Sequence, residues 1–211
     1  MNRAFEDARR WSAQGTKLFL DTVAGMRDAD DDQNYAGPSL LPGWTRRHLV
    51  AHVAANADAL GNLVHWAATG EWTPMYATPE ERAAGIERGS RMTGSELSRL
   101  LRRSAAELAA SMDRLTEQQW TTEVVTARGR TVPATEIPWL RAREVCVHAV
   151  DLGLGLSFAD LPADFLSALC DDIVAERGDV PDTDGPLDQR AAWLAGRPHD
   201  LAGAPDLGAW L

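Results

Sequence analysis

The chain has 211 residues, of which 45% are hydrophobic and 25% are charged, and its formal net charge at pH 7 is −10. These values are typical of a soluble globular protein with one main core and room for a small additional domain. The acidic balance argues against a nucleic-acid-binding surface, which needs a basic patch. It leaves small anionic substrates open, because these need only a few local arginines.

No apolar run reaches the length of a membrane span, and residues 1–10 are a charged helix start rather than a signal peptide. The two cysteines, Cys146 and Cys170, match neither a zinc motif nor a CxxC pair. We therefore expect a cytoplasmic enzyme with reduced thiols and no membrane partner.

In the first half of the chain, apolar residues recur about every 3.6 residues, which predicts helices. The first spans residues 3–27 and is followed by an acidic, polar loop over 28–37. A second helix starts after a capping Thr45 and runs to about Thr69, with His52 on its inward stripe. A connector then leads to a short helix that starts at Glu80.

A third long helix is predicted to start at Thr93, whose spacing to Glu96 fits a capping box. Residues 121–132 alternate in polarity around Arg128-Gly129 and predict a small hairpin or an extended link. The fourth long helix spans Pro138–Asp151, with Pro138 in its first turn and Thr135 as its cap.

Four long helices with polar groups facing inward predict a mainly α protein built on a four-helix bundle, which we assign to residues 1–160. A small C-terminal domain, residues 161–211, is expected to contain helices over Pro162–Glu176 and about Asp188–Leu194. Its α or α/β character stays open.

Glu144 and His148 lie four residues apart on the fourth helix, so their side chains share one face. That face also carries apolar residues, and a buried carboxylate there needs a partner. A third ligand would come from a facing helix, where His52 is the best candidate. A His2Glu set leaves the fourth position of a tetrahedral zinc open, as in catalytic sites, although other divalent metals fit the same donors.

Several other interpretations compete with this one. A Glu/His pair at this spacing is often a surface pair, and a histidine on an apolar stripe is often a hydrogen-bonded core residue. His48 is a weaker ligand candidate than His52, because it falls in the first turn of its helix toward solvent. Cys146 points away from the face that carries Glu144 and His148, and is expected to be a core residue.

Five segments of the chain resemble the mycothiol-dependent maleylpyruvate isomerases, a family of the DinB/YfiT-like metal-dependent bundles. They are GWTRRHLVAH (43–52), NADAL (56–60), TPMY (73–76), RTVPA (130–134) and REVCVHAVDL (143–152). The resemblance implies a DinB-like four-helix bundle with a C-terminal domain that is shortened relative to the family between about Val180 and Arg190. It also implies His52, Glu144 and His148 as the three zinc ligands.

Two arginines enter through the resemblance alone. Arg82 matches a family arginine associated with the active site, and Arg197 lies in a terminal A-G-R…W-L pattern, in which the arginine reaches toward the zinc. Both are candidates to hold the carboxylate and enolate oxygens of a small anionic substrate. From the residues alone, each would be an ordinary surface charge.

The activity implied by the resemblance is the conversion of maleylpyruvate to fumarylpyruvate. A zinc-bound mycothiol thiolate would add to the cis double bond, the resulting single bond would rotate, and elimination would restore the alkene. Two alternatives remain. One is a mycothiol S-transferase acting on another electrophile, and the other is a non-catalytic, ligand-binding bundle in which the metal only holds the helices together. The oligomeric state is undetermined, with a monomer favoured.

Overall fold

The computed structural model describes residues 3–27 and 31–211 and divides the chain into two compact units. The larger unit comprises residues 5–153, and the smaller combines residues 1–4 with 154–211. The elements of the larger unit are α1 (Phe5–Ala24), η1 (Gly25–Arg27), α2 (Asp31–Ala36), α3 (Arg46–Thr69), α4 (Pro79–Gly89), α5 (Gly94–Met112), α6 (Glu117–Trp120), β1 (Glu123–Val125), β2 (Thr131–Pro133), η2 (Ala134–Glu136) and α7 (Ile137–Asp151).

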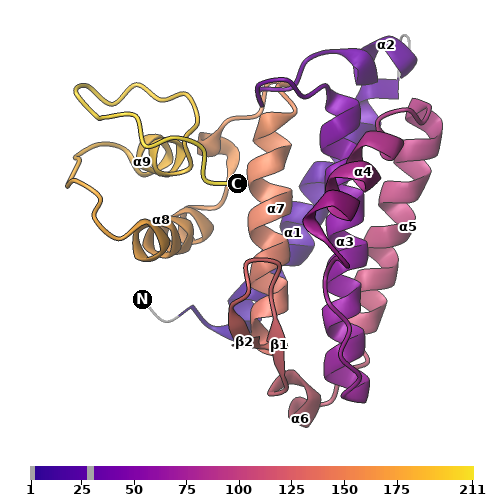
Figure 1. The fold of residues 1–211 in the computed structure, drawn as a ribbon. Coiled ribbons are helices and arrows are strands. Elements are labelled where there is room, and N and C mark those ends of the chain that lie inside the picture. The colour runs from indigo at the N-terminus through magenta and orange to yellow at the C-terminus, as the bar shows by residue number, and fades with distance from the viewer. Residues whose placement is uncertain (1–2, 28–30) are drawn as a thin grey trace. The chain divides into compact units, whose positions relative to one another are not determined.

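The four long helices α1, α3, α5 and α7 run side by side and form the predicted bundle (Figure 1). Helix α1 packs mainly on α7, and α5 packs mainly on α3, while α3 also contacts α7. Contact between α1 and α5 is much sparser. The bundle is therefore packed most closely along the α1–α7 and α3–α5 seams, and it is most open along the α1–α5 seam.

Local capping chemistry accounts for where α3 and α5 begin. Thr45 precedes α3 in an extended conformation. Thr93 accepts a hydrogen bond from the backbone N–H of Glu96, while the Glu96 carboxylate accepts one from the backbone N–H of Thr93. Such reciprocal bonds satisfy amide groups that have no partner inside the helix. The predicted starts of both helices are confirmed.

The prediction for the segment before α3 was wrong in part. Residues 31–36 form the short helix α2 where we expected a loop, and residues 28–30 lie outside the described part of the chain. A helix of six residues, which makes less than two turns, is too short to show a repeating apolar stripe, so periodicity does not detect it.

The fourth long helix is entered through a hairpin. Strands β1 and β2 pair antiparallel, with Val124 opposite Val132, and the 3₁₀ turn η2 leads directly into α7. The expected cap was wrong. Thr135 lies within η2, and the residue that precedes α7 is Glu136, whose side chain makes no capping bond. Pro138 does occupy the first turn, where no backbone N–H is needed.

The beginning of α3 and the end of α7 are tied together. Arg46 donates from Nε to the carbonyl oxygen of Leu152 at 2.8 Å, and from Nη1 to that of Asn34 at 3.1 Å. The backbone N–H of Leu40 donates to the carbonyl oxygen of Asp151 at 2.8 Å. These bonds fix the start of α3, the helix that carries His52, and the end of α7, the helix that carries Glu144 and His148.

The smaller unit is helical. It contains η3 (Phe158–Asp160), α8 (Ala163–Arg177) and α9 (Leu187–Leu194), and no strand occurs in it among the described residues. Helices α8 and α9 pack on each other. Arg177, at the end of α8, donates hydrogen bonds to the carbonyl oxygens of Leu194, Leu207 and Gly208, which fasten the terminal segment to this helix pair.

Candidate metal centre

Helices α3 and α7 bring His52, Glu144 and His148 together inside the bundle. The Oε2 atom of Glu144 lies 2.9 Å from Nε2 of His52 and 3.2 Å from Nε2 of His148. One ligand atom from each residue lies within 4.8 Å of the other two. Within the described residues this is the one group of at least three histidine, cysteine or acidic side chains with that geometry.

The donor set fits a small divalent cation. Two donors that each lie about 2.0–2.1 Å from a tetrahedral zinc are roughly 3.3 Å apart, which is close to the separations found here. Two imidazole nitrogens and one carboxylate oxygen suit zinc and related first-row metals. Both histidines are buried, and Glu144 is partly exposed.

Asp151 orients one of the histidines. Its Oδ2 atom lies 2.8 Å from Nδ1 of His148, and the carboxylate is fully buried. With a proton on Nδ1, the lone pair of Nε2 points toward Glu144, as a metal ligand requires. In the sequence, Asp151 ends the predicted fourth helix, and no role was predicted for it. Its position three residues after His148 was the available signal.

Burial and the neighbouring charges shift the pKa values of the three cluster residues in different directions. Burial alone would lower the pKa of His148, but its hydrogen bonds to Asp151 and Glu144 outweigh burial and raise that pKa above 6.5. Burial likewise opposes ionisation of Glu144, yet the two histidines hold the pKa of its carboxyl well below the ordinary value. Burial lowers the pKa of His52, and Glu144 compensates only in part.

Apart from the contact of its Nε2 atom with Glu144, His52 is held by ring packing. Its ring lies edge-on to Trp44, with centroids 5.5 Å apart, and to His148, with centroids 5.0 Å apart. Its Nδ1 atom is buried and has no hydrogen-bond partner among the described residues. The two histidines share Glu144 but differ at Nδ1, which a second carboxylate holds in His148 and no hydrogen-bond partner holds in His52.

His48 lies outside the cluster, and its hydrogen bonds explain why. Its Nδ1 atom accepts from the backbone N–H of Thr45 at 3.2 Å, which makes the imidazole part of the helix cap. Its other ring nitrogen lies 3.6 Å from a carboxylate oxygen of Glu87. The side chain one turn before His52 thus serves the start of α3.

Cys146 faces a different helix from the cluster, as its position on α7 indicated. Its sulfur lies against Gly15 of α1, where a Cβ atom would clash with both Cys146 and Val145. Burial raises the pKa of the Cys146 thiol to about 12. Burial also raises the pKa of Cys170 to about 11. Both thiols are protonated at neutral pH and are poor nucleophiles.

Arg82, on α4, lies near the cluster and beside Tyr76. Its Cζ atom is 5.9 Å from the centroid of the Tyr76 ring, and its charge contributes to the lowered pKa of His52. Burial is the main cause of a raised pKa at Tyr76, to which the charge of Glu144 adds. Both residues line a cavity of about 300 Å³ whose other walls include Trp66, Met75 and the β1–β2 turn.

Arg197 belongs to the smaller unit, so its predicted role toward the cluster stays a prediction. Its Nη1 atom donates to the carbonyl oxygen of Ala195 at 2.6 Å, and its backbone N–H donates to that of Ala192. These bonds hold the arginine at the end of α9.

Solved structures with the same fold include two that align over nearly the whole chain. They are described as the crystal structure of the mycothiol-dependent maleylpyruvate isomerase and of its H52A mutant. Each is 35% identical, with a TM-score of 0.89, and the match covers 99% of this chain and 98% of that chain.

YfiT from Bacillus subtilis, described as a probable metal-dependent hydrolase with an unusual four-helix bundle topology, is a more distant match. It has 16% identity and a TM-score of 0.55, over 72% of this chain and 89% of that one. At this identity the similarity concerns the fold alone, and it confirms the predicted DinB/YfiT-like bundle. No helix among the described residues combines the length and apolarity that crossing a membrane requires.

No curated protein matches the chain significantly. A family model does match: residues 13–153 fit the one described as the mycothiol maleylpyruvate isomerase N-terminal domain. That range contains α3, α7 and the whole His52–Glu144–His148 cluster. The predicted family and its isomerase class are confirmed, and the chain belongs to the mycothiol maleylpyruvate isomerase family.

Proposed function

We propose that the chain isomerises maleylpyruvate to fumarylpyruvate with mycothiol as its thiol cofactor. We further propose that His52, Glu144 and His148 hold one divalent metal, for which zinc is the simplest choice. The observation that carries this proposal is the convergence of the three donor atoms within 4.8 Å, in a chain of this family. When bound, the metal would lower the pKa of a coordinated thiol and so supply a thiolate at neutral pH.

The protein supplies no thiolate of its own in the described bundle. Cys146 is buried against α1, and its thiol is protonated at neutral pH. Cis–trans isomerisation of a conjugated alkene needs a nucleophile that adds reversibly, so that the former double bond can rotate. An external thiol therefore fits the cluster better than a protein cysteine does.

Each residue of the cluster has a distinct task in this proposal. Glu144 supplies the negative charge that attracts the cation, and the two imidazoles supply neutral donors. Asp151 keeps the proton of His148 on Nδ1, away from the metal-binding nitrogen. Three protein ligands leave a position for the thiol sulfur and hold it in a fixed place relative to the substrate.

Arg82 is proposed to bind a carboxylate or enolate oxygen of the substrate. The guanidinium can meet a carboxylate with two parallel hydrogen bonds, and negative charge grows on these oxygens when a nucleophile adds. Tyr76 stays protonated because burial raises its pKa, and its ring packs beside the guanidinium. The adjoining cavity of about 300 Å³ would take the rest of a small substrate. Arg197 is proposed as a second oxygen-binding arginine.

The decisive experiment supplies maleylpyruvate with a catalytic amount of mycothiol and follows both the cis substrate and the free thiol. We expect the substrate to be converted to the trans isomer with no net loss of thiol, and metal-depleted protein to be inactive. Stoichiometric consumption of thiol would instead identify an S-transferase. A metal-loaded protein that binds no thiol would identify a purely structural metal.

The role of Arg82 is tested by Arg82→Ala beside Arg88→Ala, an exposed arginine on the same helix. Loss of a charge-assisted contact predicts that kcat/KM falls roughly 10- to 100-fold in the Arg82 variant. The Arg88 variant and the metal content of both should stay at the parent level. An Arg82→Ala enzyme with unchanged kcat/KM would remove this residue from the mechanism.

A further inference from the structure

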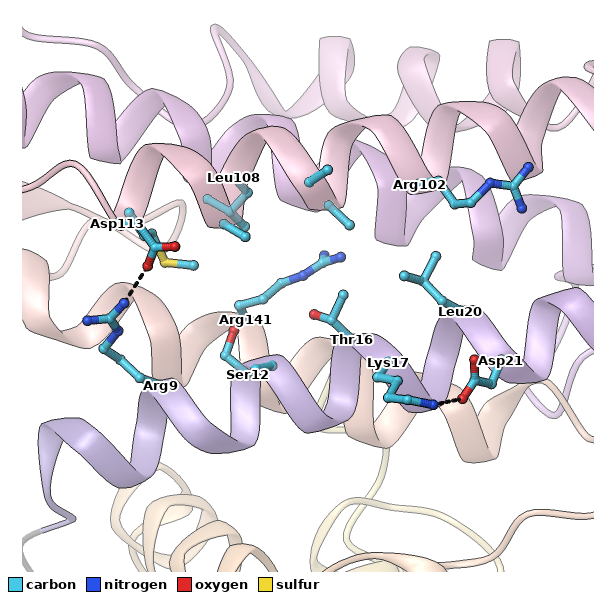
Figure 2. A pocket seen from close by; sticks show the side chains of 15 residues that line it. Arg9, Ser12, Thr16, Lys17, Leu20, Asp21, Arg102, Leu108, Asp113 and Arg141 are labelled. Carbon is cyan, nitrogen blue, oxygen red and sulfur yellow. Dashed lines mark hydrogen bonds and ion pairs between the residues drawn. The ribbon is translucent and has the colours of Figure 1, made fainter.

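A second cavity lies on the sparsely packed α1–α5 seam, and it is distinct from the one beside Arg82. Its volume is about 440 Å³, and its walls come from α1, α5 and the side chain of Arg141 on α7 (Figure 2). Four alanines, Ala13 on α1 and Ala105, Ala106 and Ala109 on α5, contribute to these walls. Side chains of this size cannot fill the space between two helices, so the seam stays open.

Arg141 forms the polar part of this cavity. Its side chain is 2% exposed, and Figure 2 shows the guanidinium lying between α1 and α5. The Nη1 atom donates to the carbonyl oxygen of Val53 at 2.8 Å and to Oδ1 of Asn56 at 2.9 Å. Both acceptors are neutral and belong to α3.

The charge of Arg141 has no ion-pair partner among residues 3–27 and 31–211, since no carboxylate oxygen lies within 4.0 Å of its nitrogens. Glu144 and Asp58 influence it only from farther away. A buried cation that is not matched by a nearby anion is costly, which is why such groups are normally paired. Burial accordingly lowers the pKa of Arg141 to about 10, which still leaves it protonated at neutral pH.

At the rim of the cavity, Arg9 and Lys17 differ from Arg141 because each pairs with a carboxylate, whereas Arg102 donates to the hydroxyl of Ser98 at 2.7 Å. Arg9 bonds to Asp113, and Lys17 bonds to Asp21, as the dashed lines in Figure 2 mark. Ser12 and Thr16 add hydroxyl groups to the α1 wall (Figure 2). A negatively charged ligand would therefore find its counter-charge at Arg141 and apolar contacts on the alanine walls.

From this arrangement we propose that the α1–α5 cavity binds a small organic monocarboxylate with an apolar body, whose carboxylate pairs with Arg141. The apolar body would displace water from the space between the two helices, which favours binding in proportion to the apolar area buried. This site is separate from the metal centre and does not depend on the proposed isomerase activity.

The test titrates octanoate into the metal-loaded full-length protein by isothermal calorimetry, with neutral octanamide as the matched ligand. We expect octanoate to bind at least roughly tenfold more tightly than octanamide, since the charge-assisted bond to Arg141 is lost with the amide. Ala109→Phe should fill the cavity and weaken octanoate at least roughly tenfold. Ala110→Phe, the neighbouring exposed position outside the cavity walls, should bind octanoate like the parent.

Arg141→Met, if folded, should abolish the preference for octanoate over octanamide. If that variant does not fold, the Ala109 and Ala110 pair still decides. The proposal is overturned if octanoate does not bind, or if Ala109→Phe binds it as well as Ala110→Phe does. It is also overturned if octanoate binding survives in Ala109→Phe but is lost in His52→Ala, because the carboxylate then binds at the metal centre.

Discussion

Helix α7 carries the buried guanidinium of Arg141 and, three residues later, the partly buried carboxylate of Glu144, and their surroundings differ. The carboxylate of Glu144 lies within 3.2 Å of two imidazoles, one of which is in turn bonded to Asp151. The guanidinium of Arg141 meets only neutral oxygens of α3 within hydrogen-bonding distance among the described residues. One region thus balances its charge within the fold, while the other presents an uncompensated cation to a cavity.

The comparison indicates what each region is suited to bind. A cluster of donors around a carboxylate attracts a cation, and an isolated guanidinium beside apolar walls attracts an anion with an apolar body. The donors of the first region come from α3 and α7, whereas most walls of the second come from α1 and α5. Variants that affect one region and spare the other test this distinction.

The largest effect is expected from His52→Ala. Loss of one of three ligands should reduce bound metal from about one ion per chain to less than about a tenth, while the bundle stays folded because its core is apolar. His48→Ala is the matched control and should keep its metal. Elemental analysis after gel filtration measures this, and a fully metallated His52→Ala protein would contradict the ligand assignment.

Asp151→Asn should have the next largest effect. Replacing the carboxylate that orients a ligating histidine typically lowers metal affinity about 10- to 100-fold. Competition with a chromogenic chelator would report the change, and circular dichroism would check that the fold is retained. An affinity equal to that of the parent would show that the ring packing of His148 suffices to orient it.

Acidification should weaken metal binding through His148. Its folded-state pKa lies above 6.5, so below that pKa an incoming cation must displace a proton, and the apparent affinity should fall about tenfold per pH unit. Burial lowers the pKa of His52, and the two histidines hold that of Glu144 well below its ordinary value, so His148 binds its proton more readily than either of them. Chelator competition between about pH 5 and 8 measures the slope. A flat profile would mean that His148 does not exchange its proton for the metal.

The smallest effect is expected from Ala109→Phe. Filling the α1–α5 cavity should leave metal content and isomerase turnover within about twofold of the parent, because an exposed position on α5 contacts none of the three donors. A parallel loss of metal and of octanoate binding would show that the two regions are coupled. The two regions would then not bind their ligands independently.

Features set by neighbouring residues were predictable from the sequence. The start of α5 follows from the spacing of Thr93 and Glu96, and the start of α3 from the residues around Thr45. Glu144 and His148 share a face because of helical geometry alone. Their meeting with His52 needed one further assumption, namely that the inward stripes of α3 and α7 face each other.

The misses have physical reasons. Helix α2 is too short for a periodic signal, and the expected cap Thr135 lies within η2, so Glu136 precedes α7 instead. Arg141 was overlooked because arginine is usually at the surface, whereas here its guanidinium is buried and bonded to oxygens of α3, a helix far away in the sequence. No local pattern could show that the alanines of α5 would face its guanidinium.

The fastening of α3 to α7 by Arg46 has a consequence for how the metal centre responds to thermal opening. The bonds of Arg46 and Leu40 hold the start of α3 and the end of α7, whereas the hairpin leads into α7 at its opposite end. If the bundle opened first at the hairpin, the turns of α7 next to the hairpin would separate first. The donor atoms of His52, Glu144 and His148 would then keep their positions. Amide hydrogens near His52 and His148 should therefore exchange with deuterium more slowly than those near Val132, even before a metal is added.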